Sequence, residues 1–377
     1  MTPPTLQIEL RNHTRSSKVF AYITGRDLTN DNAWFLLSSD GQTAYHPTSP
    51  ATILQPLTQD CSISLEKDSS RTVTIPRIAG GRIWFSIDVP LVFLLNPGPT
   101  LVEPSVTNPS DPNYNTTWHF CEFTFNEAQL FANISYVDFV CLPIALMVRN
   151  ARGECLRVEG HGSDGLEKVA EGLERQHASD GAGWDELVVR QQQGKKVLRV
   201  LSPNNAIVLK PELLSGYWDA YINEVWEKYR DQSLTVNTQA AAGQVEGRVV
   251  QDHLEFAAGR FAKPSARDVF GCSSGPFTPA GGPDVLAIIP RLAAAVNRST
   301  LHSHDFQPNG DAVGAYYGHE VTNHYARVVH EVNLDGRGYA FPYDDVVPDG
   351  GRDVAGTLFD GEPVLFTVTV GGGGGRD

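Results

Sequence analysis

The expected fold is decided by one stretch of the chain, residues 116–148, which reads TTWHFCEFTFNEAQLFANISYVDFVCLPIALMV. It holds two apolar, strand-like runs, and each carries one acid, Glu122 in the first and Asp138 in the second. A carboxylate inside such a run is costly to bury without a partner. The two acids therefore predict a carboxylate pair facing a groove, if the two strands are neighbours. The alternative is two unrelated acids on a solvated sheet face. Because side chains alternate between the faces of a strand, Glu122 shares its face with Trp118, Phe120, Thr124 and Asn126.

The pattern on the N-terminal side of this stretch is also typical of β-structure. Short alternating runs, rich in β-branched and aromatic residues, are separated by Gly, Pro, Asn and Asp. A Pro-rich segment, residues 95–115, is long enough to form a functional rim. Many short strands at this spacing predict a β-sandwich or barrel. The runs are LQIELRN (6–12), KVFAYITG (18–25), AWFLLS (33–38), RTVTIPRI (71–78) and GRIWFSID (81–88).

After residue 160 the pattern changes to helices mixed with strands. Residues 163–176 predict a helix, and residues 211–231 predict another with aromatic and aliphatic residues at three- and four-residue steps. This aromatic stripe is interpreted as core packing rather than as a platform for stacking sugars. Residues 245–256 predict a strand, and residues 282–301 predict a helix that contains a proline.

Strand-like runs return towards the C-terminus, at residues 324–332, 338–347 and 363–370. The chain is therefore expected to be mainly β, with a helix-rich α/β domain inserted between two parts of one β domain. The last seven residues, GGGGGRD, predict a flexible tail. The expected boundaries are residues 1–208 and 312–377 for the β domain and residues 209–311 for the insertion.

The composition excludes several classes of partner. The formal net charge of −14 argues against nucleic acid or an anionic membrane surface as the main partner, but it does not oppose a neutral polymer. No apolar run approaches the roughly 20 residues of a membrane-spanning helix. The N-terminus MTPPTLQIEL shows no signal peptide. The five cysteines follow no zinc-binding spacing, and Cys121 and Cys141 are interpreted as small buried hydrophobic residues.

Three short patterns resemble chemical motifs without meeting their requirements. HEVTNH places His319 and His324 five residues apart, whereas the helical zinc-protease motif needs four. HSHD (302–305) could bind a metal through alternate strand residues, but it is interpreted as a polar loop. CSSGPF (272–277) lacks the G-x-S-x-G elbow of a hydrolase nucleophile. No metal or organic cofactor is expected.

Several segments taken together resemble one family. LQIELRNHTRSSKVFAYITG is similar to the first hairpin of thaumatin-like β-sandwich proteins, and GYAFPYDDV with LFTVTV is similar to their closing strand region. CEFTFN, YVDFVCLPIAL, YWDAYINEVWEKY and DVFGCSSGPF resemble glycoside hydrolase family 64, the thaumatin-fold endo-β-1,3-glucanases that release laminaripentaose. The resemblance covers roughly residues 5–370, including the helix-rich insertion.

The resemblance implies an inverting glucanase with a wide groove between a thaumatin-like β domain and an inserted α/β domain. By position, Glu122 matches the family's general acid and Asp138 its general base. Thr124 and Asn126 would point into the groove beside Glu122. The pair Asp344 and Asp345 matches acids of the groove wall, with a solvated turn as the alternative.

The implied partner is a β-1,3-glucan such as laminarin, bound without a cofactor by a chain expected to be monomeric. The resemblance implies secretion, although no signal peptide is visible. Two competing hypotheses remain. One is a thaumatin-like protein that binds β-1,3-glucan without cleaving it, which would not need both acids in one groove. The other is a metalloprotease acting through His319 and His324, which would need bound zinc.

Overall fold

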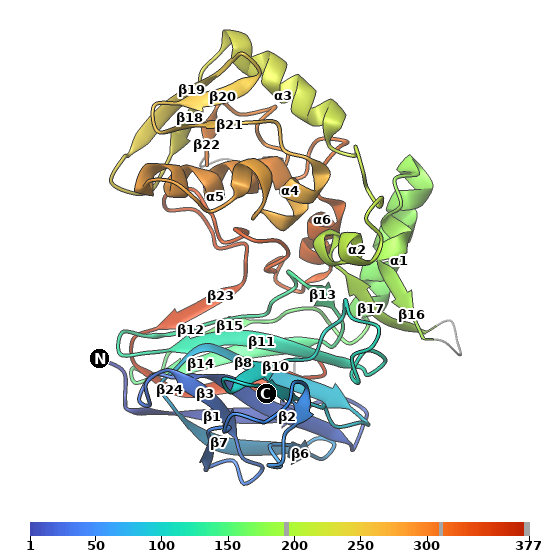
Figure 1. Cartoon of the computed structure of the whole chain (residues 1–377), viewed down its shortest axis with the longest axis vertical. Helices are drawn as coiled ribbons and strands as arrows, with labels where there is room; N and C mark the ends of the chain where they lie inside the picture. Colours follow the sequence, from blue (N-terminus) through green and yellow to red (C-terminus); the bar gives the residue numbers. More distant parts are fainter. Residues whose placement is uncertain (192–195, 309–311, 373–377) are drawn as a thin grey trace.

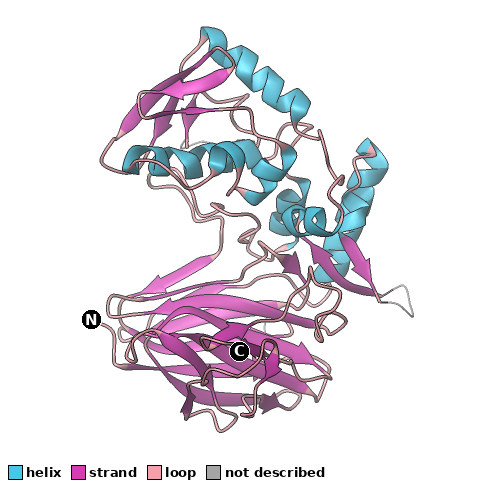
Figure 2. Ribbon diagram, viewed as in Figure 1, coloured by secondary structure: helices cyan, strands magenta, loops and turns pink. Residues whose placement is uncertain are grey.

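The computed structural model describes residues 1–191, 196–308 and 312–372, and within them the chain is mainly β. Two sheets form a sandwich, drawn in the lower half of Figure 1. The helices gather above one sheet and along one side of the molecule (Figure 2). Two expectations lie partly outside the described residues: the C-terminal tail, at residues 373–377, and the end of the insertion, at residues 309–311.

One layer of the sandwich is a five-stranded sheet with the order β15-β14-β24-β1-β7. The first and last strands of the chain, β1 and β24, lie side by side in it and run parallel. The predicted strand at residues 363–370 is confirmed, with these bounds. The strands are β15 (Cys155–Val158), β14 (Ile144–Asn150), β24 (Pro363–Val370), β1 (Thr5–Asn12) and β7 (Ser70–Pro76).

The other layer is an eight-stranded sheet with the order β23-β12-β11-β8-β2-β3-β4, in which β6 also pairs with β2. A smaller sheet, β10-β9-β5, joins two strands at the start of the Pro-rich region to a short strand from much earlier in the chain. The strands of the large sheet are β23 (Thr357–Asp360), β12 (Leu130–Asn133), β11 (Trp118–Phe125), β8 (Ile78–Ile87), β2 (Val19–Asp27), β3 (Ala33–Leu37), β4 (Ala44–Tyr45) and β6 (Ile63–Leu65). Those of the small sheet are β10 (Thr100–Val102), β9 (Leu94–Asn96) and β5 (Gln55–Pro56).

The core lies between the two large sheets and fixes which way β11 faces. On β11, Phe123 is buried and its ring centroid lies 6.3 Å from that of Phe366 on β24 in the opposite sheet. Glu122 and Thr124 alternate with these core residues, so they lie on the outer face of the eight-stranded sheet. This outer face is the one over which the helical part of the chain stands in Figure 1.

The helical part contains a five-stranded sheet with the order β21-β20-β19-β18-β22. The predicted aromatic stripe packs in its core, because Trp218, Tyr221 and Tyr229 are fully buried. The elements are α3 (Asp219–Asp231), β18 (Leu234–Asn237), β19 (Gln244–Val250), β20 (His253–Phe256), β21 (Gly259–Phe261), α4 (Ala266–Gly271), η2 (Gly275–Phe277), α5 (Pro283–Asn297), β22 (Phe306–Gln307) and η3 (Ala312–Ala315).

A third group of elements connects this part to the sandwich at one side (Figure 1). Its small sheet has the order β13-β17-β16, and α1 packs against both α6 and β17. The elements are β13 (Phe139–Val140), α1 (Gly165–Asp180), η1 (Trp184–Leu187), β16 (Val188–Arg190), β17 (Val197–Leu201), α2 (Pro203–Leu209) and α6 (His324–Val332).

Three strand predictions are wrong. Residues 324–332 form the helix α6, because the Asn323 side chain caps it by accepting a hydrogen bond from the Ala326 amide. Residues 338–347 form turns, with one isolated bridge between Tyr339 and Ser135. Residues 245–256 form a hairpin rather than one strand.

The hairpin turn falls at Gln251 and Asp252, which both have positive φ, 46° and 69°. Two consecutive left-handed residues are typical of a tight hairpin turn, and Asp tolerates this conformation better than most residues. The predicted helix at 211–231 also begins later than expected, at Asp219. Before it, Leu214 and Gly216 have positive φ, which a helix cannot contain.

Candidate active site

A row of polar residues crosses the outer face of the eight-stranded sheet. Each member pairs directly with the next on the neighbouring strand, and directly paired residues point to the same face. Glu122 is therefore flanked by Arg82 of β8 on one side and Asn133 of β12 on the other. The row runs Thr24, Arg82, Glu122, Asn133 and Thr357, on β2, β8, β11, β12 and β23.

Glu122 is half-buried, and Arg82 holds it in place. The Nε and Nη2 atoms of Arg82 both donate to Oε1 of Glu122, each at 3.2 Å. Oε2 of Glu122 makes no hydrogen bond with the residues that the structure describes. The side chain of Glu122 is 35% exposed, so part of it can be reached from outside the sheet. Glu122 can therefore exchange a proton with a bound molecule.

A third acid, Glu103, shares the same arginine. Its Oε2 accepts a hydrogen bond from Nη1 of Arg82, and its Oε1 accepts one from the Thr24 hydroxyl at 3.4 Å. Burial raises the pKa of the Glu103 carboxyl, and the charge of Arg82 offsets part of that rise. Glu103 follows β10 in the Pro-rich segment that the sequence predicts to be a rim. Arg82 and Glu103 are both absent from the residues singled out by sequence pattern.

Asp138 lies in the loop immediately before β13, not within a strand beside β11. The condition attached to the predicted carboxylate pair, that the two strands are neighbours, is therefore not met, since β11 pairs with β8 and β12 while β13 pairs with β17. Oδ1 of Asp138 accepts a hydrogen bond from Nδ2 of Asn205 on α2, at 3.2 Å. The same Nδ2 donates to the backbone carbonyl of Asp138 at 3.1 Å, which fixes the loop.

The charge of Asp138 also acts on Arg82, the residue that binds Glu122. Burial lowers the pKa of Arg82, but the charges of Glu103, Glu122 and Asp138 outweigh this effect and raise it above its ordinary value. One guanidinium is thus influenced by three carboxyl groups from three separate segments of the chain. Two of them, Glu122 and Asp138, are the acids expected from the sequence to act together.

Thr124 and Asn126 differ in their surroundings. Thr124 is half-buried on the same face as Glu122, and directly beside it across the strands lie Phe131 and then Phe359. Asn126 lies in the turn after β11. Its Oδ1 accepts hydrogen bonds from the amides of residues 128 and 129, at 2.9 and 3.0 Å. This oxygen of Asn126 therefore stabilises the hairpin, which leaves its NH₂ group to contact a ligand.

Asp344 and Asp345 are adjacent but point into opposite environments. Asp344 is fully buried, and its carboxylate binds Arg298 and His330, both at 2.9 Å. It has no surface with which to contact a ligand, so it does not fit the expected role of a groove-wall acid. Asp345 is exposed. Burial and the charge of Asp345 raise the pKa of Tyr339, which pairs with Ser135 in the loop that leads to Asp138.

The motifs that resembled metal or nucleophile sites have other partners. His324 contacts the carbonyl of Glu320 at 3.0 Å and Arg327 at 3.0 Å, whereas His319 lies 3.4 Å from Glu224. Within residues 1–191, 196–308 and 312–372, no group of three or more His, Cys, Asp and Glu side chains is arranged to hold a metal ion. Cys272 is buried, and burial raises the pKa of its thiol, which keeps it protonated and unreactive.

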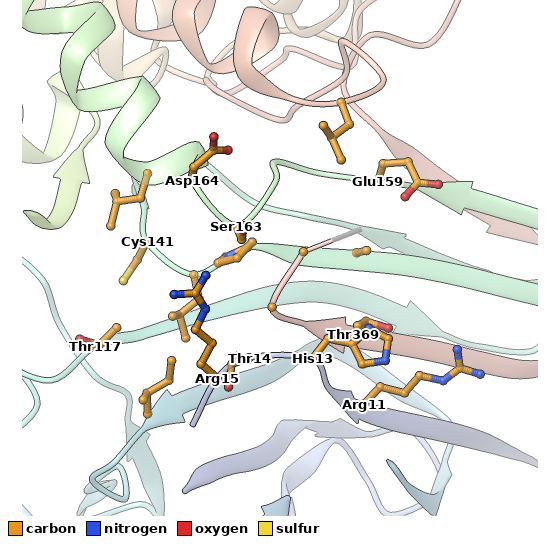
Figure 3. A pocket seen from close by; sticks show the side chains of 18 of the residues that line it. Arg11, His13, Thr14, Arg15, Thr117, Cys141, Glu159, Ser163, Asp164 and Thr369 are labelled. Atoms are coloured by element: carbon orange, nitrogen blue, oxygen red, sulfur yellow. The ribbon is translucent and has the colours of Figure 1, made fainter. Parts of the chain in front are cut away.

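A cavity of about 1330 Å³ lies elsewhere, between the outer face of the five-stranded sheet and the start of α1 (Figure 3). Arg11 and Thr369 line it from the sheet, and Asp164 lines it from the helix end. Its charged residues have both signs. Glu103, Glu122, Asp138, Asp344 and Asp345 do not line this cavity, and so its volume alone does not make it the catalytic site. In the described part of the chain, no helix is both long and apolar enough to cross a membrane.

Comparison with known proteins gives matches along almost the whole chain. The family model for β-1,3-glucanases of glycoside hydrolase family 64 matches residues 4–370. A glucan endo-1,3-β-glucosidase of Cellulosimicrobium cellulans is 33% identical over 321 residues, and the match covers 81% of this chain and 56% of that protein. The chain thus spans about half the length of the curated relatives it matches.

Two solved structures have a similar fold, and each superposition covers almost the whole of this chain and of the matched chain. A laminaripentaose-producing β-1,3-glucanase in complex with laminaritetraose superposes with a TM-score of 0.86 at 31% identity, over 98% of this chain and 99% of that one. A β-1,3-glucanase domain of family 64 from Clostridium beijerinckii superposes with a TM-score of 0.76 at 21% identity, over 97% and 98%. At that lower identity the match concerns the fold alone.

Proposed function

Because the chain belongs to the β-1,3-glucanases of glycoside hydrolase family 64, we propose that it is an endo-acting glucanase that cleaves laminarin-type β-1,3-glucan with inversion. The observation that carries this proposal is the position of Arg82, which binds Glu122 on an accessible sheet face and is also influenced by the charge of Asp138. Two carboxyl groups near one substrate bond are what glycoside hydrolysis requires.

In the proposed reaction, Glu122 is the general acid and Asp138 the general base. Oε2 of Glu122 gives its proton to the glycosidic oxygen as the bond from that oxygen to the anomeric carbon breaks. Asp138 takes a proton from a water molecule that attacks the same carbon from the opposite face. Inverting enzymes keep the two carboxyl groups about 6.5–9.5 Å apart to admit this water. No metal or cofactor enters these steps.

Substrate contacts are proposed along the outer sheet face. Thr124, the NH₂ group of Asn126 and the exposed carboxylate of Asp345 are suited to hydrogen bonds with sugar hydroxyls. Phe359 lies two strands away from Thr124 in the same cross-strand row. Its side chain is 63% exposed and offers an apolar surface on which a sugar ring can stack. Asp344 is left out of this set because it is fully buried. Since the glucan is neutral, its binding is expected to depend little on salt concentration.

Four further features extend the proposal. The sandwich is of the thaumatin-like type and belongs to a discontinuous β domain of residues 1–208 and 312–377. Residues 209–311 form an inserted α/β domain that supplies the second wall of a wide groove. The protein acts outside the cell as a monomer. Its products have a defined length such as laminaripentaose, the product named for a structurally similar enzyme.

Incubation with laminarin, followed by ¹H NMR of the fresh products, tests both the activity and its stereochemistry. Inversion at a β-linkage releases the α-anomer first, before mutarotation restores the mixture. We expect a transient excess of α-anomer, with oligosaccharides of one main size on a thin-layer plate. Initial β-anomer would assign a retaining mechanism instead. Binding without any product would identify a non-catalytic glucan-binding protein.

Replacing Asp138 with asparagine is expected to stop the activation of water while leaving Glu122 able to protonate the leaving oxygen. Added azide can then take the place of the activated water, because it needs no base. We expect azide to restore part of the turnover and to form an α-glycosyl azide. A β-glycosyl azide would require a covalent intermediate on another carboxyl group and would assign a retaining mechanism. The matched control is Asp345→Asn, in which azide should have no effect.

A further inference from the structure

Arg82 is divided between two carboxyl groups, and only one of them has a role in the proposed reaction. Its Nε and Nη2 atoms bind Glu122, whereas its Nη1 atom binds Glu103. The side chains of Arg82 and Glu103 are 31% and 21% exposed, so both are largely shielded from water. In such surroundings, charges act on one another more strongly than they do at an open surface.

The surrounding side chains fix this arrangement. The guanidinium of Arg82 lies over the rings of Phe120 and Trp84, with its central carbon 4.9 and 5.6 Å from their centroids. The indole of Trp84 donates a hydrogen bond to the Thr24 hydroxyl at 3.0 Å, and that hydroxyl donates to Glu103. Arg82 therefore cannot leave Glu122 without losing its contacts with these rings. Glu103 is likewise held in position, on the side of the guanidinium away from Glu122.

An arginine bound to a general acid is a problem for catalysis. A positive charge in contact with a carboxyl group favours its ionised form, whereas a general acid must hold its proton until the substrate arrives. The charged groups around Glu122 are Arg82 from β8, Glu103 from the segment after β10 and Asp138 from the loop before β13. From β12, the neighbour is the uncharged Asn133.

We propose that Glu103 is a positioning residue that neutralises Arg82, so that the arginine does not hold Glu122 in its ionised form. This inference rests on the proposed function, since it assigns Glu103 a task only if Glu122 is the acid. Ionised Glu103 has two effects in the same direction. It offsets the charge of Arg82, and its own negative charge disfavours a second negative charge on Glu122. Asn133, which pairs with Glu122 across the strands, is uncharged and supports the protonated form of Glu122. Its buried Oδ1 makes no hydrogen bond with the described residues, so it can accept one from a protonated carboxyl group.

The decisive variant is Glu103→Gln, which keeps the shape of the side chain and removes its charge. The full positive charge of Arg82 then acts on Glu122, and the pKa of Glu122 should fall by about one unit or more. The basic limb of the pH profile of kcat/KM should move to lower pH by the same amount. Below the new pKa, activity should approach that of the unmodified enzyme, because Glu122 is again protonated.

The pKa of Glu122 can be measured without activity, by ¹³C NMR of the full chain labelled at the glutamate side-chain carboxyl carbon. The signal is assigned by its loss in Glu122→Gln. The double variant Glu103→Gln with Arg82→Met removes both charges, and the pKa of Glu122 should be higher in it than in Glu103→Gln alone. Glu9→Gln is the matched control, because Glu9 also binds an arginine, Arg11, at 2.8 Å with side-chain exposures of 17% and 33%.

The possible outcomes separate this inference from the function on which it rests. A lower pKa of Glu122 in Glu103→Gln, recovery in the double variant and no change in Glu9→Gln would support the inference. An unchanged pKa of Glu122 in a folded Glu103→Gln protein would overturn it. If the pKa falls but Glu122→Gln hydrolyses laminarin normally, the coupling between the two carboxyl groups stands and the proposed catalytic role of Glu122 fails.

Discussion

Replacing Glu122 with glutamine is expected to lower the turnover of laminarin by about 10²–10⁴-fold, the usual effect of removing a positioned general acid. The amide has the same shape as the carboxyl group and can still interact with Arg82, but it cannot give a proton to the leaving oxygen. The fold and the affinity for laminarin should therefore change little. Initial rates of reducing-end release, together with binding measured by calorimetry, check both parts of this expectation.

The leaving group provides a sharper test of the role of Glu122. An aryl β-laminarioside with a good leaving group needs little protonation, so Glu122→Gln should cleave it almost as fast as the unmodified enzyme does. Asp138→Asn should be slow on both substrates, because water still lacks its base. If Glu122→Gln lost both activities equally, its defect would lie in binding or folding, and another acid would have to be sought.

The strand face on which Glu122 lies could be predicted from the sequence, because strand alternation is a local property. Trp118 and Phe120 share its face, and the structure places all three on the same side of β11. Asp138 could also be noticed from local sequence, as an acid inside an apolar run.

The position of Asp138 in the fold could not be predicted, since a run of apolar residues does not reveal where a strand begins. The strand β13 begins just after Asp138 and pairs with β17, which is far along the chain.

The partners of these acids are distant in sequence, which is why they carry no local signal. Arg82 and Glu103 precede Glu122 by many residues, and Asn205 lies far beyond Asp138. One indication was nevertheless present. Arg82 belongs to the strand-like run GRIWFSID, where a charged residue on the same face as Trp84 needs an acidic partner once it is buried. The Pro-rich segment that contains Glu103 was the long loop best able to supply one.

The helix α6 was missed because its pattern is ambiguous. HYARVVHEV is rich in β-branched residues, which favours a strand, yet its buried residues follow helical spacing. The cap at Asn323 and packing against α1 decide the outcome. The consequence reaches the acidic pair near the C-terminus. With α6 as a helix, His330 projects towards Asp344 and joins it in a buried cluster, which separates Asp344 from its exposed neighbour Asp345.

Replacing Asp344 with asparagine is expected to destabilise the protein by about 3–5 kcal/mol, the usual effect of removing one partner from a buried ion pair. Asp344 and Arg298 are 0% and 3% exposed at their side chains, and their contact measures 2.9 Å. Without the carboxylate, the Arg298 charge stays buried among carbonyl oxygens, the Tyr316 hydroxyl and ring faces, and none of these carries a negative charge. Unfolding in urea, followed by tryptophan fluorescence, measures the change in free energy.

The neighbouring variant Asp345→Asn is the matched control for stability. It removes the same charge from the next residue, but Asp345 is exposed, so the change should stay within about 0.5 kcal/mol. Equal midpoints for the two variants would mean that the cluster of Asp344, Arg298 and His330 adds no net stability. In that case the energy of forming the buried pair would merely balance the cost of removing both charges from water.

The pH dependence of the Asp344→Asn effect identifies its electrostatic origin. Burial alone would raise the pKa of Asp344, but His330 and Arg298 together bring it below its ordinary value. A carboxyl group with a depressed pKa in the folded state stabilises the protein above its unfolded pKa, near about 3.9, and loses this contribution as pH falls through the folded pKa. The stability difference between the unmodified chain and Asp344→Asn should therefore be largest near neutral pH and shrink in acid. A difference that stayed constant with pH would assign the loss to packing instead of charge.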